Sequence, residues 1–287
     1  MSFEVEPLFR GTTIDTSVLT SFPAIAEQRV AQILAGEAED YPIYRFFDYL
    51  RDPNPTPEAL TWISFTTRAK AIAARLQQLC ERGDRVVVMM SQNLDYITGF
   101  FAPFFGGQIA VPAFSPTEPA HAGYLEAILT DAQPKVILTD AKVAGSVRQF
   151  LKNVHVENKP RIIAVEGIED EMAASWVDPE LDPEDIAYLQ YSSGSTGTPK
   201  GVLDAYRCIL WQLDVMRTTW NSDTSPVSIS WLPLHHDMGI VWGIFDILCL
   251  GGCAGYLPTA LFAKNPTIWV NAMSTYKCGM TAAPDTM

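Results

Sequence analysis

The stretch Arg85–Phe114, RVVVMMSQNLDYITGFFAPFFGGQIAVPAF, decides the fold class of this chain. It opens with a continuous apolar run typical of a buried strand, continues with an apolar segment of helix length, and closes with a second apolar run. The same alternation continues downstream, which predicts strands at 85–90, 108–114, 136–139 and 161–165 and helices at 94–105, 120–130 and 141–151. Short apolar strands alternating with helices are typical of an α/β fold with a doubly wound, mostly parallel sheet and flanking helices.

Further elements are expected on both sides of this core. On the N-terminal side we expect a helix at 25–35, then strands at 43–49 and 60–65 joined by the turn-rich DPNPTP, and a helix capped by Thr66 or Thr67. On the C-terminal side we expect strands at 186–191, at 227–231, near Tyr256 and at 280–283, and helices at 206–220, directly after the HHDMG segment and at 266–276. The acidic, proline-containing stretch 166–185 predicts a boundary between a first α/β subdomain, 1–180, and the start of a second, 181–287.

The composition restricts the possible functions. The chain has 33 acidic and 20 basic residues, a formal charge of −13, and no basic stripe, so nucleic-acid binding is not expected. Neither the N-terminus MSFEVEPLFRG nor the apolar stretch 238–257, which contains Asp246, has the pattern of a signal peptide or a transmembrane segment. Five cysteines without a CxxC pair suit a reducing, cytoplasmic compartment.

A glycine-rich loop directly follows one of the expected strands. Ser192–Gly201 reads SSGSTGTPKG, in which three glycines allow tight turns while hydroxyl and backbone N–H groups can surround phosphate oxygens. Lys200 supplies the positive charge that an acidic protein otherwise lacks. The loop does not follow the Walker A pattern, because Pro199 precedes the lysine and Gly201 follows it. A flexible linker is the alternative, but linkers seldom adjoin a buried strand and end in Pro-Lys-Gly.

A second polar motif lies between a strand and an apolar helix. Ser230–Gly239 reads SWLPLHHDMG, which places two histidines and an aspartate at a helix N-terminus, where anions are favoured. Three interpretations are open: a metal site, a helix cap by Asp237, and a substrate site. Adjacent side chains usually point apart and no further ligand cluster is evident, so no metal ligands are expected.

Together the two motifs resemble those of the adenylate-forming superfamily. The phosphate loop is similar over Tyr188–Val202, YLQYSSGSTGTPKGV, and the WLPLxHDMG form of the second motif is typical of fatty-acyl-AMP ligases, including the mycobacterial long-chain type. The stretches 92–121, 132–140 and 261–270 support that branch. The resemblance implies the incomplete large N-terminal domain of an enzyme that activates a fatty acid with ATP and Mg²⁺. It also implies transfer of the acyl group to an acyl carrier protein or polyketide synthase.

The resemblance assigns site residues position by position. The residues expected to hold the ATP phosphates are Ser192, Ser193, Gly194, Ser195, Thr196, Gly197 and Lys200. The residues expected at the acyl site are His236, Asp237, Met238, Gly239 and Trp242. His236 and Lys200 would act in catalysis, where the fatty acid's carboxylate attacks the α-phosphate of ATP and pyrophosphate leaves.

The sequence also departs from the family pattern. Ala205-Tyr206 replaces a Ser/Thr-His pair, Ala282-Ala-Pro-Asp-Thr286 replaces an Ala-Pro-Asn-Phe segment, and Trp242 occupies a position that is usually smaller. Trp242 is expected either to shorten the acyl pocket, which favours medium chains, or to be a packing residue that faces elsewhere. The family's later motifs and its small C-terminal domain are absent before Met287, so we expect a fragment whose activity alone is weak or absent. An acyl-CoA synthetase and a non-catalytic nucleotide- or acyl-binding relative are the competing interpretations.

Overall fold

The computed structural model describes residues 20–52, 55–117, 122–192, 199–220 and 227–284. The chain forms two compact units that interleave along the sequence. One comprises Met1–Phe65, Gln92–Leu94 and Leu210–Met287, and the other comprises Thr66–Ser91 and Asp95–Ile209. The subdomain boundary expected at 180/181 stays a prediction. The two compact units are each made of several chain segments and do not divide at that point.

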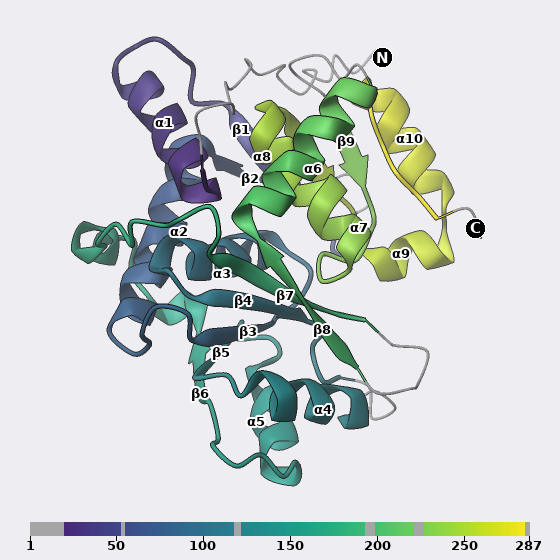
Figure 1. Cartoon of the computed structure of the whole chain (residues 1–287). Coiled ribbons are helices and arrows are strands. Elements are labelled where there is room, and N and C mark those ends of the chain that lie inside the picture. Colours follow the sequence, from purple (N-terminus) through teal and green to yellow (C-terminus); the bar gives the residue numbers. More distant parts are fainter. Residues whose placement is uncertain (1–19, 53–54, 118–121, 193–198, 221–226, 285–287) are drawn as a thin grey trace. The chain divides into compact units, whose positions relative to one another are not determined.

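The unit around residues 95–209 is built on a six-stranded sheet with the order β6-β5-β3-β4-β7-β8 (Figure 1). All neighbours are parallel except β7 and β8, which pair antiparallel. The strands are β3 (Arg85–Met89), β4 (Ile109–Ala113), β5 (Val136–Thr139), β6 (Arg161–Ala164), β7 (Ile186–Ser192) and β8 (Lys200–Ala205). The connections run in both directions from β3, and the expected doubly wound α/β fold is confirmed.

Helices cover both faces of this sheet. The helices are α3 (Leu94–Gly106), α4 (Ala122–Ala132) and α5 (Ala144–Asn153), with short 3₁₀ turns at Val165–Gly167 and Asp170–Ser175. Buried side chains of α4 and α5, such as Leu125 and Val147, form a core with alternate strand residues such as Val87 and Ile137. On α3, Phe100 contacts Tyr188 of β7, with ring centroids 6.2 Å apart. This two-sided burial explains why the strands read as continuous apolar runs.

The other unit contains a four-stranded sheet with the order β2-β1-β10-β9. Its strands are β1 (Pro42–Phe46), β2 (Glu58–Thr61), β9 (Val227–Ser230) and β10 (Cys253–Tyr256). Its helices are α1 (Phe22–Leu34), α7 (Asp237–Ile240), α8 (Asp246–Leu250), α9 (Thr259–Lys264) and α10 (Thr267–Thr275), with a π-helical turn at Val241–Phe245. Helices α2 (Trp62–Gln77) and α6 (Tyr206–Thr219) each begin in one unit and end in the other.

Three of the expected elements differ in the structure, and two were not predicted. The strand expected at 60–65 is β2 over Glu58–Thr61, and residues 62–65 belong to helix α2. The helix expected from Thr66 or Thr67 begins at Trp62 instead. The Ser64 hydroxyl accepts from the Thr61 N–H (2.8 Å) and the Thr61 hydroxyl from the Ser64 N–H (3.2 Å), a reciprocal capping pair that starts the helix early. Instead of a strand at 280–283, the described residues there make one isolated bridge, between Met280 and Ser228. The sequence did not predict β8 or α9.

Candidate functional site

The phosphate-loop sequence lies in a hairpin formed by β7 and β8, which we call the phosphate hairpin. Ser192, the last residue of β7, pairs with Lys200, the first residue of β8. This pairing brings the two ends of the loop together and leaves the Lys200 side chain exposed. The predicted phosphate ligands between them, Ser193, Gly194, Ser195, Thr196 and Gly197, lie outside the described residues.

One tyrosine stabilises the base of the phosphate hairpin. The Tyr191 hydroxyl donates to an Asp131 carboxylate oxygen (2.5 Å), and the Tyr124 hydroxyl donates to the Tyr191 carbonyl oxygen (3.3 Å). A Cβ atom at Gly201 would lie 3.0 Å from the Tyr191 ring, so glycine allows the two strands to pack closely at this point. Burial, with the hydrogen bond to Asp131, raises the pKa of Tyr191 well above its ordinary value, so the hydroxyl stays a donor.

The second motif begins the helical segment Asp237–Leu250, which we call the acyl-site helix. His236 is the N-cap residue and makes no side-chain cap bond. Asp237 instead lies in the first turn, where its Oδ1 atom accepts from the Met238 N–H (2.6 Å) and lies 2.5 Å from His236 Nδ1. Both side chains are 66% exposed, so this polar pair is accessible to a ligand.

Gly239 allows a close approach of the chain to itself. An added Cβ atom would lie 2.1 Å from the Pro233 carbonyl oxygen, a backbone atom that no rotamer change can move away. The glycine therefore lets the WLPL segment fold back against the first turn of the acyl-site helix.

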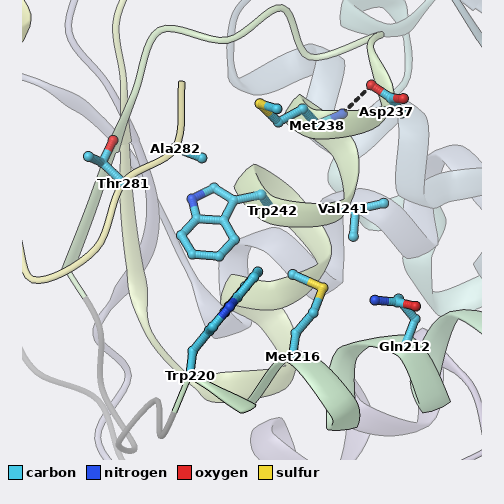
Figure 2. Close-up of a pocket in the computed structure, with 9 residues that line it drawn as sticks. All are labelled: Gln212, Met216, Trp220, Asp237, Met238, Val241, Trp242, Thr281 and Ala282. Atoms are coloured by element: carbon cyan, nitrogen blue, oxygen red, sulfur yellow. Dashed lines mark hydrogen bonds between the residues drawn. The ribbon is translucent and has the colours of Figure 1, made fainter. Parts of the chain in front are cut away.

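An apolar pocket of about 610 Å³ opens beside the acyl-site helix (Figure 2). Its lining residues are Gln212, Met216, Trp220, Asp237, Met238, Val241, Trp242, Thr281 and Ala282. Trp242 and Trp220 contact each other edge to face, with ring centroids 4.7 Å apart. Met238, another lining residue, is partly exposed to solvent. Flexible methionines and flat indole rings suit an extended hydrocarbon chain.

Only some of the residues predicted for the acyl site line the pocket. It includes Asp237, Met238 and Trp242, whereas His236 and Gly239 are not among its described lining residues. The lining position of Trp242 agrees with a role in the pocket and not with packing elsewhere. The sequence did not predict as lining residues Gln212 and Met216, which share one face of α6, or Trp220, which directly follows this helix.

Neither ATP nor a metal ion has a complete site among the residues that the structure describes. Ser192 and Lys200 stand at the two ends of the loop, and their role as phosphate ligands stays a prediction. Among the residues that the structure describes, no group of three or more His, Cys, Asp and Glu side chains could hold a metal ion. No helix in the described parts of the chain is long and apolar enough to cross a membrane.

The AMP-binding enzyme family matches residues 35–287, and the chain belongs to this family. Its sequence is 38% identical over 232 residues to the long-chain-fatty-acid–AMP ligase FadD32 of Mycolicibacterium smegmatis, covering 80% of this chain and 37% of that protein. It is 32% identical over 261 residues to the putative fatty-acid–CoA ligase FadD21 of Mycobacterium tuberculosis, covering 88% of this chain and 44% of that protein.

The solved structures agree with these relatives. The fatty acyl-adenylate ligase from L. pneumophila, solved in complex with acyl adenylate and pyrophosphate, superposes with a TM-score of 0.83 at 28% identity. The match covers 95% of this chain and 46% of that one. The resemblance to the adenylate-forming superfamily is thus confirmed, and the chain spans less than half the length of these relatives.

Proposed function

We propose that this chain carries the phosphate-binding and acyl-binding parts of an enzyme that converts a fatty acid to its acyl-AMP with release of pyrophosphate. The observation that carries the proposal is the apolar pocket beside the acyl-site helix. Its lining of two tryptophans and two methionines suits a hydrocarbon chain, and the lining also includes Asp237 of the exposed His236–Asp237 pair. The same chain carries the phosphate-loop sequence on a strand hairpin.

In the proposed reaction a carboxylate oxygen of the fatty acid attacks the α-phosphorus of ATP. A new bond forms between that oxygen and phosphorus, and the bond from the α-phosphorus to the bridging oxygen breaks as pyrophosphate leaves. Lys200 stabilises negative charge on the phosphates, and His236 orients the carboxylate. Mg²⁺ would neutralise further phosphate charge when bound. The protein therefore acts mainly by holding two anions together.

The proposal also includes the molecule that accepts the acyl group from acyl-AMP. The resemblance of the two sequence motifs to fatty-acyl-AMP ligases implies an acyl carrier protein or polyketide synthase as the acceptor, whereas the similarity to the putative fatty-acid–CoA ligase FadD21 makes coenzyme A a second candidate. A reducing, cytoplasmic compartment suits the five free cysteines. With less than half of the relatives' length present, we expect weak activity or none from this chain alone.

The test combines binding with turnover. The purified 287-residue chain is incubated with ATP, Mg²⁺ and fatty acids of medium to long chain, and acyl-AMP is sought by mass spectrometry. Fatty-acid binding is measured on the same sample by calorimetry. We expect binding that weakens when a bulky polar group enters the pocket, as in Met216→Lys, and any acyl-AMP formed to disappear in Lys200→Ala and His236→Ala.

Lys142→Ala is the matched control, because it removes an exposed lysine from the same unit as Lys200, outside the phosphate hairpin. It is expected to behave as the unmodified chain. Fatty-acid affinity that is absent, or the same in Met216→Lys, would reject the acyl site. With coenzyme A added, accumulation of acyl-AMP favours the carrier-protein route and thioester formation favours the synthetase.

A further inference from the structure

The acyl-site helix contains a π-helical turn at the point where it lines the pocket. The turn spans Val241–Phe245, and the Asp246 N–H bonds to the Val241 carbonyl oxygen, five residues back. Such turns are rare in proteins, and those that do occur often lie at functional sites. Because each helical residue advances by about 100°, one extra residue in a turn rotates everything before it by that angle relative to everything after it.

This rotation decides which side chains enter the pocket. After the turn, α8 is buried along its whole length, so its orientation is set by packing. Before and within the turn lie Met238, Val241 and Trp242, which all line the pocket (Figure 2). If the turn became regular, these side chains would rotate away from their present directions while α8 stayed buried.

Two buried tyrosines from neighbouring strands hold the turn. The Tyr256 hydroxyl, on β10, donates to the Gly243 carbonyl oxygen (2.6 Å), and the Tyr44 hydroxyl, on β1, donates to the Ile244 carbonyl oxygen (3.0 Å). Both side chains are fully buried, and their ring centroids lie 6.2 Å apart. Burial raises the pKa of both hydroxyls well above the ordinary value, so they remain donors.

We infer that Tyr256 and Tyr44 are positioning residues that stabilise the π turn and thereby set the direction of Trp242 and the acyl-chain length that the pocket accepts. Neither tyrosine is a lining residue of the pocket, so each acts through the helix. Trp242 immediately precedes Gly243, whose carbonyl accepts the shorter of the two bonds. The statement about chain length rests on the proposed function, whereas the statement about the turn does not.

The chain provides a matched control for these bonds. The Tyr41 hydroxyl also donates to a backbone carbonyl, that of Gly251 (2.5 Å), but this carbonyl lies beyond the end of α8. Tyr41→Phe therefore removes a comparable tyrosine-to-carbonyl bond in the same unit without touching the π turn. An effect that came only from lost stability would appear equally in Tyr256→Phe, Tyr44→Phe and Tyr41→Phe.

The first measurement needs no ligand. The chain is labelled with 5-fluorotryptophan, and the Trp242 resonance is identified by its loss in Trp242→Phe. We expect Tyr256→Phe and Tyr44→Phe to move this resonance, together with that of its contact partner Trp220, and Tyr41→Phe to leave both in place. An unmoved Trp242 resonance in Tyr256→Phe and Tyr44→Phe, or an equal shift in Tyr41→Phe, would overturn the inference.

The second measurement is calorimetric binding of saturated medium-chain and long-chain fatty acids to the same variants. We expect the ratio of the two affinities to change by about two- to tenfold in Tyr256→Phe, the range that one buried hydrogen bond allows, and not in Tyr41→Phe. Trp242→Ala should remove the effect of Tyr256→Phe. An unchanged ratio would overturn the role in specificity. No binding by the unmodified chain would instead reject the proposed acyl site, and the fluorine spectra would still decide the role in the turn.

Discussion

The phosphate hairpin and the acyl-site helix carry the two motifs of this chain, but they are held in place by different means. The hairpin is held mainly by the ladder between two strands that are adjacent in sequence, with Ser192 opposite Lys200. The acyl-site helix is held by side chains from distant strands, and Tyr44 lies 200 residues before the carbonyl it binds. A motif can therefore be recognised from a few consecutive residues of the sequence, although its geometry in the folded protein depends on contacts with distant residues.

The largest expected effect lies on the acyl-site helix. Gly239→Ala would place a Cβ atom against the Pro233 carbonyl oxygen, and we expect a loss of about 2–4 kcal/mol in the free energy of unfolding. Urea denaturation measures it. Gly243→Ala is the control on the same helix, since its added Cβ atom would come no closer than 3.8 Å to a neighbour, and it should be nearly neutral. Equal losses in both variants would contradict the account of Gly239.

The next effect concerns the pocket itself. Trp242→Ala removes a ring from the pocket lining, and each additional methylene of a longer fatty acid that becomes buried should contribute about 0.8 kcal/mol to binding. We therefore expect the preference to move toward longer chains, as measured by calorimetry with a fatty-acid series. Trp211→Ala, which removes a 67% exposed tryptophan from α6, should leave the profile unchanged. An unaltered profile in Trp242→Ala would mean that this ring does not limit chain length.

A pH effect on stability is expected from Asp246, a buried residue of the acyl-site helix. Burial raises the pKa of Asp246 to about 7, whereas an unfolded aspartate titrates near 4. Between these values the folded state holds the extra proton, so the free energy of unfolding should fall by about 3 kcal/mol as the pH rises from about 4 to about 7.

Asp246→Asn should flatten this slope in urea denaturation repeated across that pH range. Asp237→Asn serves as the control, because its carboxylate on the same helical segment is 66% exposed. If the slope survives in Asp246→Asn, a different group is responsible for it.

The smallest expected effect lies on the phosphate hairpin. Tyr191→Phe removes the hydrogen bond to Asp131, which we expect to lower the free energy of unfolding by about 1 kcal/mol. Tyr124→Phe, which loses the longer bond of 3.3 Å to the Tyr191 carbonyl, should cost less. Thermal unfolding measures both. A larger loss in Tyr124→Phe would contradict the assignment of Tyr191 as the main support of the hairpin.

Much of the fold could be predicted because its signals are local. The strands at 85–89, 109–113 and 136–139 are buried on both faces, and their apolar runs show this directly. The errors occur where a local signal was weak or misleading. Helix α2 starts early through the Thr61–Ser64 capping pair, and β8 was missed because its Val202 and Leu203 are apolar but exposed.

The sequence by itself determined the α/β class, the family and the presence of both motifs, because short periodic patterns and consecutive motif residues carry that information. Only the tertiary structure decided which residues share the pocket and how Trp242 enters it. The pocket joins α6, the acyl-site helix and residues near 281, and its shape depends on a π turn bound by Tyr44 and Tyr256. Contacts between residues so far apart leave no periodic trace in the sequence, since each depends on the packing of all the elements between them.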